Sequence, residues 1–478
     1  MQWFLLEEDI LDIDSLQYFE RQGSVNSKEV ICFLDKFLNS LSLSSKTNIK
    51  EKRRTVNQSN QILFLFERLG ISIEDFEFIN VVGTSGKGSV TMMLSECLFS
   101  ARESVGAFFS PHVSSISERF WFNGSFVEPK LVAKIYDRFV SVIKNIVEDP
   151  KSVTPTFFES TFALFLLLAK ESNCKILVLE AGIGGKYDVT CIPFCQKLSV
   201  ITKIALDHTE ILGKNVSEIS RDKAGIIAEN GQVLVSKNHY VVRGEISKIA
   251  KSKSAKFYSA PVVQSVKSKS NSTSFNLNFS DGSMMKNLSI SMHGEHQLDN
   301  AAVVVGACKL LGLDELSIVK GLAKSRLPGR IEIVSKNPSV ILDIAHNPNK
   351  IKALMKFLRT RSEEKIIFII GFLEGKDFSA MIEEFSEIGG VFFFTSPPTY
   401  GSRRNISLDK LNNVLLEKRI SDFKNYIDPC QALKDALRLS GKDDLIVVTG
   451  SSYLVGELRK FWFRDDIILQ TGNPFIKK

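Results

Sequence analysis

The chain has 478 residues, more than one hydrophobic core usually serves, so two or three domains are expected. Hydrophobic residues make up 44% and charged residues 24%, which is ordinary for a soluble globular protein. The net charge of +7 is mild over this length. It would suit an anionic substrate, but with the basic residues mostly scattered it gives no support to a nucleic-acid-binding function.

The seven cysteines do not suggest a disulfide framework. Cys191 and Cys195 stand four apart without a second Cys or His pair at zinc spacing, so we interpret them as free thiols. The acidic N-terminus, MQWFLLEEDILDID, looks like neither a secretory nor a mitochondrial presequence. The longest apolar run, from Phe162 to Ala169, is too short to span a bilayer and fits a buried helix. We therefore expect a cytoplasmic protein, and we expect it to be a monomer.

Residues 1–55 are helix-like and then polar, without a sharp motif. The residue pattern changes at Phe76, where FEFINVV predicts a strand, VVGTSGKGSV a loop and VTMMLSECLFSA a helix. KILVLEAG (175–182) and LSVITKIALDH (198–208) predict two more buried strands, each running into polar residues. Strands rich in Val, Ile and Leu between helices indicate a parallel α/β sheet, in which ligands bind at the carboxyl ends of the strands.

Residues 252–292 alternate polar and apolar side chains and predict antiparallel hairpins, with a turn at Asp281-Gly282. A helix is expected at about 297–312, followed by a hinge centred on Pro328 and Gly329. Strands and helices then alternate again, with SVILDIAHN, KIIFIIGFL, VFFFTSPP and DLIVVTGS as strands. This pattern predicts a second α/β domain from about residue 331 to the end.

The glycine-rich stretch VVGTSGKGSV lies between a predicted strand and a predicted helix. Its spacing differs from the usual phosphate-loop pattern G-x-x-x-x-G-K-[ST]. Its three glycines would let backbone N–H groups approach a ligand, and the helix N-terminus would favour an anion. Lys87 could neutralise β- and γ-phosphate oxygens, and the Ser89 hydroxyl could lie near Mg²⁺. The alternative is a tight turn without a ligand; the strand–loop–helix context favours phosphate.

Glu180 and His208 stand at predicted strand ends, where a carboxylate and an imidazole could hold a metal ion that bridges a nucleotide. Taken singly, either could equally be structural, as an ion-paired carboxylate or a core histidine. His346, after another predicted strand, is either part of a turn or a group facing an interdomain cleft. GIGGKYD fails as a dinucleotide fingerprint because Tyr187 stands at the third glycine position, so a substrate loop is the better interpretation. Lys223 is not singled out by any pattern.

The motifs resemble, in order, those of the folylpolyglutamate synthase/dihydrofolate synthase branch of the Mur ligase superfamily, from about Phe76 to Arg459. The stretches that carry the resemblance are VVGTSGKGSV, FFSPH with SERFWFNG, TFFESTFALF, LVLEAGIGGKYDVT, VITKIALDHTEILG, RDKAGII, GEHQLDNAA, LPGRIEI, LDIAHNP and TGSSYLVGELR. Two segments depart from the family's usual sequence. Ser85 replaces Asn in the loop, and GGKYDVTC replaces GGRLDATN.

The resemblance implies a two-domain ATP-dependent amide ligase. Residues 1–326 would form an N-terminal extension and an ATP-binding α/β domain with a P-loop-type, mostly parallel sheet, and residues 331–478 a smaller Rossmann-like α/β domain for glutamate ligation. ATP would phosphorylate a pteroate or folate carboxylate, and the amine of L-glutamate would displace phosphate from the acyl phosphate. ATP and Mg²⁺ are the implied cofactors, since both lower the charge barrier to carboxylate attack. The implied partners are small molecules, with no nucleic acid and no membrane.

The resemblance also assigns roles by position. Nucleotide contacts fall on Gly83, Thr84, Ser85, Gly86, Lys87, Gly88, Ser89, Asn300, Arg330 and Asp343. Mg²⁺ ligands fall on Ser110, Glu180, His208 and Lys223, the last matching a lysine that the family carbamylates with CO₂. The pterin-side pocket falls on Phe157, Phe158, Glu159, Ser160, Tyr187, Asp188 and Val189. Catalytic roles fall on Lys87, Lys223 and His346, with His346 near the transferred phosphoryl group.

Three alternatives compete with a folate ligase. A Mur-type ligase for another carboxylate, such as a cell-wall precursor, would share the same phosphate chemistry. A P-loop GTPase would need an NKxD-type guanine motif, and none is present. A catalytically dead nucleotide-binding protein is disfavoured, because Lys87, Ser110, Glu180 and His208 are all present.

Overall fold

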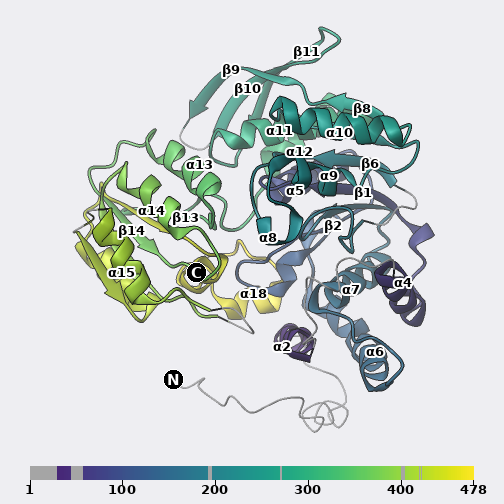
Figure 1. Cartoon of the computed structure of the whole chain (residues 1–478), viewed down its shortest axis with the longest axis horizontal. Helices are drawn as coiled ribbons and strands as arrows, with labels where there is room; N and C mark the ends of the chain where they lie inside the picture. Colours follow the sequence, from purple (N-terminus) through teal and green to yellow (C-terminus); the bar gives the residue numbers. More distant parts are fainter. Residues whose placement is uncertain are drawn as a thin grey trace.

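The computed structural model describes residues 29–44, 57–191, 196–269, 272–399, 404–418, 420 and 422–477. The fold is mixed α/β and contains an eight-stranded, a three-stranded and a six-stranded sheet within these residues. In Figure 1 the six-stranded sheet and its helices form the green-to-yellow body on one side, and the other two sheets belong to the blue-to-teal body. The predicted α/β class is confirmed, with a large, mostly parallel sheet preceding a separate C-terminal α/β unit.

The eight-stranded sheet has the order β4-β3-β2-β5-β1-β6-β7-β8. All neighbours are parallel except the pairs β2–β3 and β3–β4. The strands are β1 (Glu77–Val82), β2 (Val105–Phe108), β3 (Phe120–Phe122), β4 (Ser125–Phe126), β5 (Ile176–Glu180), β6 (Gln196–Ile201), β7 (Gln232–Val235) and β8 (Lys256–Ser259). The expectation that 252–292 forms only hairpins is wrong for β8, which extends this sheet in parallel to β7.

Alternate residues of the central strands face opposite helical layers. Leu177 and Leu179 of β5 belong to the core under α7, whereas Ile176 and Val178 belong to the core under α5. Side chains alternate along a strand, so a strand with apolar residues at every position must be covered on both faces. The covering helices are α2 (Val30–Ser44), α4 (Asn57–Leu69), α6 (Pro129–Glu148) and α7 (Phe157–Glu171) on one face, and α5 (Lys87–Ser100), α11 (His296–Leu310) and α12 (Glu315–Lys324) on the other.

The apolar run predicted to be a buried helix forms the centre of α7, and all of Phe162–Ala169 is buried. A capping box begins this helix. The Thr156 hydroxyl accepts from the N–H of Glu159, and the Glu159 carboxylate accepts from the N–H of Thr156. The remaining helices of the N-terminal part are the short α8 (Thr209–Leu212), α9 (Val216–Ala224) and α10 (Tyr240–Ser252).

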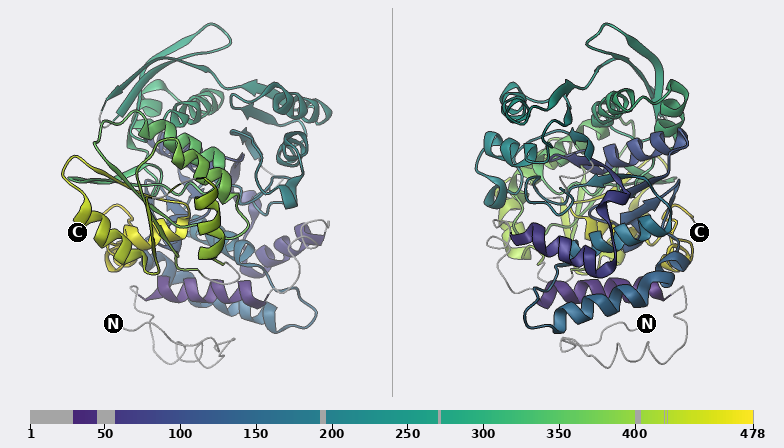
Figure 2. Two further views of the ribbon diagram at one scale, coloured as in Figure 1. Left: turned by 60° about the vertical axis from the view of Figure 1, so that its left-hand side comes forward. Right: turned by 90° about the vertical axis from the view of Figure 1, so that its right-hand side faces the viewer.

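The three-stranded sheet is antiparallel, with the order β11-β10-β9, as the alternating pattern predicts. Its strands are β9 (Val262–Lys269), β10 (Ser272–Asn278) and β11 (Met284–Ile290). The predicted turn is present, and Gly282 takes a positive φ of 81°. Figure 2 shows this sheet projecting at the end of the molecule opposite α2, α6 and α7. Apolar side chains of its inner face, such as Phe275 and Leu288, join the core that contains α11.

The C-terminal sheet has the order β12-β13-β17-β14-β15-β16 and is parallel except for the edge strand β12. Its strands are β12 (Glu332–Lys336), β13 (Ser339–Leu342), β14 (Ile366–Ile370), β15 (Val391–Thr395), β16 (Phe423–Tyr426) and β17 (Leu445–Thr449). The helices are α13 (Pro348–Leu358), α14 (Phe378–Ser386), α15 (Leu408–Glu417), α16 (Pro429–Leu439), α17 (Ser452–Arg459) and α18 (Asp465–Thr471). The four predicted strands are confirmed, but DIAHNP follows the second strand of this sheet rather than the first, because β12 precedes it. The division between residues 326 and 331 stays a prediction.

Candidate active site

The glycine-rich loop joins β1 to α5 beside β6, its parallel neighbour. The Thr84 N–H donates to the Lys203 carbonyl, and the Thr84 hydroxyl contacts the backbone of Ala205. The Thr202 hydroxyl donates to the Ser85 carbonyl at 2.8 Å. These contacts hold the loop against the carboxyl end of β6. The loop therefore opens at the sheet edge where parallel α/β proteins bind ligands.

Gly86 caps α5 with a φ of 88°, a left-handed conformation that glycine adopts without steric cost. A Cβ at this position would lie 2.2 Å from Oδ1 of Asn300. The Asn300 amide donates to Gln297, which in turn donates to the Ser89 hydroxyl at 3.2 Å. Three residues predicted to contact the nucleotide are thus brought together where the N-termini of α5 and α11 meet.

Glu180 ends β5 and is buried, with 4% of its surface exposed. Its Oε2 accepts from the Ser110 N–H at 2.9 Å, so two predicted metal ligands are adjacent. A Cβ on Gly88 would lie 3.1 Å from the same oxygen, and this places the carboxylate against the first turn of α5. Burial raises the pKa of Glu180, and the positive charge of Lys87 acts in the opposite direction.

The positive charge of Lys87 influences several ionisable groups around the glycine-rich loop. Its Nζ donates to the Gly83 carbonyl at 3.2 Å. Its charge lowers the pKa of Glu180, of His208, of Lys223 and of Lys350, although burial is the largest influence on each of these groups. Two of these groups are close to it in the structure, since Lys223 donates to the same Gly83 carbonyl and the Glu180 carboxylate lies against Gly88.

His208 lies on a loop, not at a strand end. β6 ends at Ile201, and His208 is the N-cap of α8 with a φ of 49°, which is unusual for a residue with a side chain. The apolar residues Ile204 and Ala205 extend the strand-like pattern beyond the true strand, which explains the wrong boundary. Burial lowers the pKa of His208 to about 4, so the imidazole is neutral and free to ligate a metal.

Lys223 is in the last turn of α9 and is buried, with 3% of its surface exposed. Its Nζ donates to the Gly83 carbonyl at 3.1 Å, the same oxygen that Lys87 contacts. Burial, followed by the charge of Lys87, lowers the pKa of Lys223 to about 7. A substantial fraction of the Lys223 amine is therefore neutral at neutral pH. The neutral amine is the form that reacts with CO₂.

The C-terminal part supplies His346 and Lys350. His346 Nδ1 lies 2.9 Å from the Ile344 carbonyl oxygen, and a carbonyl can only accept, so Nδ1 carries the proton. Nε2 is left to accept from Lys350 Nζ at 3.2 Å. Burial, followed by the charge of Lys350, holds the pKa of His346 well below its usual value. The pair therefore presents a neutral imidazole and an amine whose pKa burial lowers to about 7.

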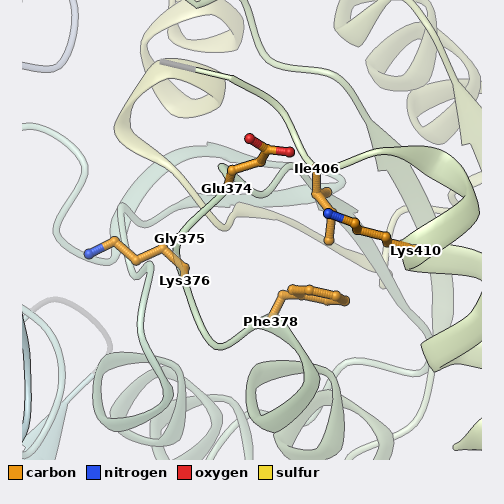
Figure 3. A pocket seen from close by; sticks show the side chains of 6 residues that line it. All are labelled: Glu374, Gly375, Lys376, Phe378, Ile406 and Lys410. Carbon is orange, nitrogen blue, oxygen red and sulfur yellow. The ribbon is translucent and has the colours of Figure 1, made fainter. Parts of the chain in front are cut away.

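Asp207 joins the two parts of the molecule beside this pair. Its Oδ2 accepts from the Asn347 amide at 3.1 Å, and its Oδ1 lies 3.8 Å from Lys376 Nζ. Lys376 also lines a pocket of about 270 Å³ with Glu374, Gly375, Phe378, Ile406 and Lys410. Figure 3 shows the Lys376 ammonium on one side of that pocket and Lys410 on the other.

Arg330 and Asp343 lie at the hinge and at the end of β13. Asp343 accepts from the N–H groups of Ile331 and Ala345, each at 2.9 Å, so its carboxylate ties the hinge to the C-terminal sheet. The Arg330 guanidinium donates to the Pro328 carbonyl, and its charge reaches Glu180 and Asp343. The charge of Arg330 thus reaches one predicted metal ligand, Glu180, and the nucleotide contacts predicted for Arg330 and Asp343 stay predictions.

The predicted pterin-side residues fall on two neighbouring segments. Phe158 lies against Gly182, where a Cβ would be 2.7 Å from the ring. Phe157 and Ser160 share the first turns of α7 with it, and the buried Ser160 hydroxyl has no hydrogen-bond partner among the described residues. Tyr187 and Val189 lie on the turn that follows Gly184 and Gly185, and Tyr187 is 45% exposed.

Two carboxylates assigned to the predicted pterin-side pocket, Glu159 and Asp188, already have structural partners. Glu159 completes the capping box of α7. Asp188 accepts from the N–H of Ile183 and from both the N–H and the hydroxyl of Thr190. The Glu159 side chain therefore stabilises the start of α7 and the Asp188 side chain the 183–190 turn, and their substrate contacts stay predictions.

The ligand groups present show which kind of metal site these residues could form. Glu180 is a buried carboxylate that forms no ion pair within the described ranges, and a bound cation would compensate its charge. The described part of the chain holds no group of three or more His, Cys, Asp or Glu side chains suited to a metal. Mg²⁺ bound with ATP needs only one or two protein carboxylates, because water and phosphate oxygens complete its octahedron. The residues therefore fit a nucleotide-bound Mg²⁺ and not a metal cage made of protein ligands alone.

Two family models match the chain in sequence order. Residues 81–308 match the Mur ligase middle domain, and residues 329–452 match the Mur ligase glutamate ligase domain. Together these matches span more than half of the chain. The chain belongs to the Mur ligase family. The match of the first domain includes every predicted phosphate and metal residue.

Sequence relatives agree with this placement. The dihydrofolate synthase/folylpolyglutamate synthase of Bacillus subtilis (strain 168) is 27% identical over 407 residues, which cover 83% of this chain and 93% of the relative. A probable bifunctional folylpolyglutamate synthase/dihydropteroate synthase of Halobacterium salinarum is 26% identical over 391 residues, or 81% of this chain. The aligned part spans only 47% of that longer relative.

Solved structures agree as well. Escherichia coli FolC in complex with DHPP and ADP matches with a TM-score of 0.75 at 26% identity, over 90% of this chain and 97% of that one. The Mycobacterium tuberculosis folylpolyglutamate synthase complexed with ADP matches with a TM-score of 0.80 at 21% identity, over 91% and 99% of the two chains. The second likeness bears on the fold alone.

Sequence reasoning missed Asp207, Lys350 and Lys376. Asp207 precedes His208 in the DHTE motif and was passed over for its neighbour. Lys350 follows His346 by four residues across the start of α13, a spacing that brings side chains together only if a helix begins there. Lys376 carried no signal of its own, because its contact with Asp207 joins residues far apart in the sequence.

Among the described residues, no helix is long and apolar enough to cross a bilayer.

Proposed function

We propose that this family member is an ATP-dependent ligase that joins L-glutamate to the carboxylate of a pteroate or folate. The observation that carries the proposal is the convergence of Lys87 and Lys223 on the Gly83 carbonyl of the glycine-rich loop, with the buried Glu180 carboxylate against the first turn of α5. The names of the relatives support the folate acceptor, and ADP in the complex of the Escherichia coli relative supports the nucleotide. A cell-wall-type acceptor gains no support from them.

In the proposed reaction, an acceptor carboxylate oxygen attacks the γ-phosphorus of ATP, and ADP leaves. The glutamate amine then attacks the acyl carbon, the bond to the phosphate oxygen breaks, and inorganic phosphate departs as the amine loses a proton. Lys87 would offset the negative charge that builds up on the transferred phosphoryl group. Mg²⁺, when bound, would supply further charge neutralisation through Glu180, Ser110 and His208.

Two basic groups of the C-terminal part suit the second step. His346 has its proton on Nδ1 and a lone pair on Nε2, and the pKa of Lys350 is lowered to about 7. A group with a pKa near the working pH can accept the proton that the glutamate nitrogen loses as its amine attacks the acyl carbon. The contact of Asp207 with Asn347 would hold these groups across from the loop.

The test is a drop-out assay on the purified protein with Mg²⁺-ATP, L-glutamate and a pteroate or folate acceptor. Phosphate release is expected only with the full mixture, because the acyl phosphate forms on the acceptor and turns over only through the amine. Omission of the acceptor or of glutamate should reduce steady release to background. Equal release without any acceptor would identify an ATPase and contradict the ligase proposal.

A second expectation concerns the chemical state of Lys223. Its burial and its lowered pKa of about 7 suit a carbamate, which would turn a cation into a carboxylate-like group beside the metal site. Enzyme depleted of CO₂ should lose activity and regain it on addition of bicarbonate, and a crystal structure should show added density on Nζ. The exposed Lys251 serves as the internal comparison. Unmodified Lys223 in a fully active enzyme would contradict this assignment.

We further propose that Ser85, the GGKYDVTC segment and α2 set the choice of acceptor. The first two differ from the usual family wording, and α2 packs against α7, which carries Phe157 and Phe158. We also propose Mg²⁺ as the metal cofactor, a cytoplasmic location and a monomeric state.

A further inference from the structure

The 110–117 loop, which follows β2, is held at its start and at its middle by buried carboxylates. At its start, the Ser110 N–H donates to Glu180 at 2.9 Å. Further along, the N–H groups of Val113 and Ser114 donate to Glu118 at 2.7 and 3.0 Å. Glu118 is only 3% exposed, so this closure is shielded from water. The loop thus carries a predicted metal ligand on a preset backbone.

A fully buried arginine of the C-terminal sheet's helices reaches the same loop. Arg459 ends α17 and is 0% exposed. It donates to both oxygens of Glu332 at 2.8 and 2.9 Å, a bidentate geometry of the strong kind. Its remaining N–H groups donate to the Ser114 hydroxyl at 3.3 Å and to the Pro474 carbonyl at 2.6 Å. One side chain therefore joins β12, the loop and the C-terminal segment.

The backbones of α17 and the loop also touch. A Cβ placed on Gly456 would lie 2.0 Å from the carbonyl oxygen of Val113, closer than any real contact allows. Only glycine permits this approach. The glycine brings the two backbones together one helical turn from Arg459, so the guanidinium can reach the Ser114 hydroxyl.

The connection continues to the hinge. The Gly329 N–H donates to Oε2 of Glu332 at 2.9 Å, the oxygen that also receives Arg459 Nε. A continuous chain of hydrogen bonds runs from the hinge through Glu332 and Arg459 to the loop. The charge of Arg459 also lowers the pKa of Glu118, against the larger effect of burial. The Arg459 charge therefore stabilises the ionised form of Glu118, the carboxylate that closes the loop.

We infer that Arg459, together with the close contact at Gly456, is a positioning element that sets the 110–117 loop according to the placement of the C-terminal part. Through the loop it holds Ser110 against Glu180 in the arrangement needed for Mg²⁺-nucleotide binding. This rests on the proposed function only in that the loop bears a predicted metal ligand. Neither Arg459 nor Gly456 touches the reacting atoms in this account.

Gly456→Ala tests the inference, because the added methyl group must separate α17 from Val113 without removing a charge. Gly441→Ala is the matched control in the same part of the chain, where a Cβ would meet only Asp444 at an ordinary 3.7 Å. ADP affinity is measured by calorimetry with Mg²⁺ and with EDTA. For Gly456→Ala the gain in affinity that Mg²⁺ provides should shrink about tenfold, the usual effect of losing a group that orients a metal ligand, while the EDTA value stays unchanged. Gly441→Ala should match the wild type.

A milder variant, Ser114→Ala, removes only the hydroxyl acceptor of Arg459 and decides the matter if Gly456→Ala does not fold. It should reduce the same Mg²⁺-dependent gain in the same direction. An unchanged gain in a folded variant, an equal loss with EDTA, or the absence of any Mg²⁺ effect in the wild type would each overturn the inference. ADP titration involves neither glutamate nor a folate acceptor, so failure of the proposed ligase activity would be seen separately.

Discussion

Lys87→Ala is expected to lower the rate of glutamate ligation by about two to three orders of magnitude, the typical effect of removing one charge-stabilising group from a transition state. Lys87 shares the Gly83 carbonyl with Lys223 and stands next to Gly88, against which Glu180 lies. Its charge acts on the pKa of Glu180, His208, Lys223 and Lys350. The fold should survive, because the Lys87 side chain is only partly buried and donates one hydrogen bond within the described part of the chain, to the Gly83 carbonyl at 3.2 Å.

The measurement is steady-state phosphate release, together with thermal unfolding of the same preparations. Lys248→Ala provides the matched control, since the Lys248 side chain is 77% exposed on α10. It should leave the rate unchanged. Near-full activity of Lys87→Ala would remove the loop lysine from the mechanism, and a large fall in melting temperature would show that the residue serves the fold.

Gly86→Ala is expected to weaken ADP binding on the order of a hundredfold. The residue has a φ of 88°, and its Cβ would lie 2.2 Å from Asn300 Oδ1. A side chain in the left-handed region costs about 1–2 kcal/mol, and overpacking adds about 1–3 kcal/mol. Relief of this clash requires the loop to move away from α11, and each 1.4 kcal/mol needed to restore the binding geometry is about tenfold in affinity.

Gly282→Ala separates the two costs. Gly282 has a similar φ of 81°, but a Cβ there would meet nothing within 4 Å. This control should lose a similar amount of stability from backbone strain and no ADP affinity, as measured by calorimetry and denaturant unfolding. Equal ADP affinity in both variants would show that the contact between Gly86 and Asn300 does not shape the nucleotide site.

The sequence predicts the local parts of this site well and the long-range parts poorly. The strand, loop and helix around Gly86 follow from neighbouring residues, so they could be recognised without the fold. The end of β6 was misplaced because Ile204 and Ala205 keep the apolar pattern after the strand has ended. β8 was assigned to the hairpins because KFYS is compatible with either kind of sheet.

The interdomain contacts carry no signal in a single sequence. Asp207 meets Asn347 across 140 residues, and Arg459 meets Ser114 across 345. Nothing in the local pattern around Arg459 distinguishes a buried arginine from one at the surface end of a helix, where basic residues are common. Such groups become visible only when the topology brings distant segments together.

The acceptor is the centre of the account, and a direct comparison of acceptors tests it best. Purified enzyme with Mg²⁺-ATP and L-glutamate is supplied in parallel with dihydropteroate, with tetrahydrofolate and with a cell-wall precursor that has a free carboxylate. Products are identified by mass spectrometry and ADP is quantified. We expect a glutamyl adduct of dihydropteroate, of tetrahydrofolate or of both, with one ADP formed for each glutamate joined. A glutamyl product from the cell-wall precursor alone, with neither pterin compound extended, would contradict it.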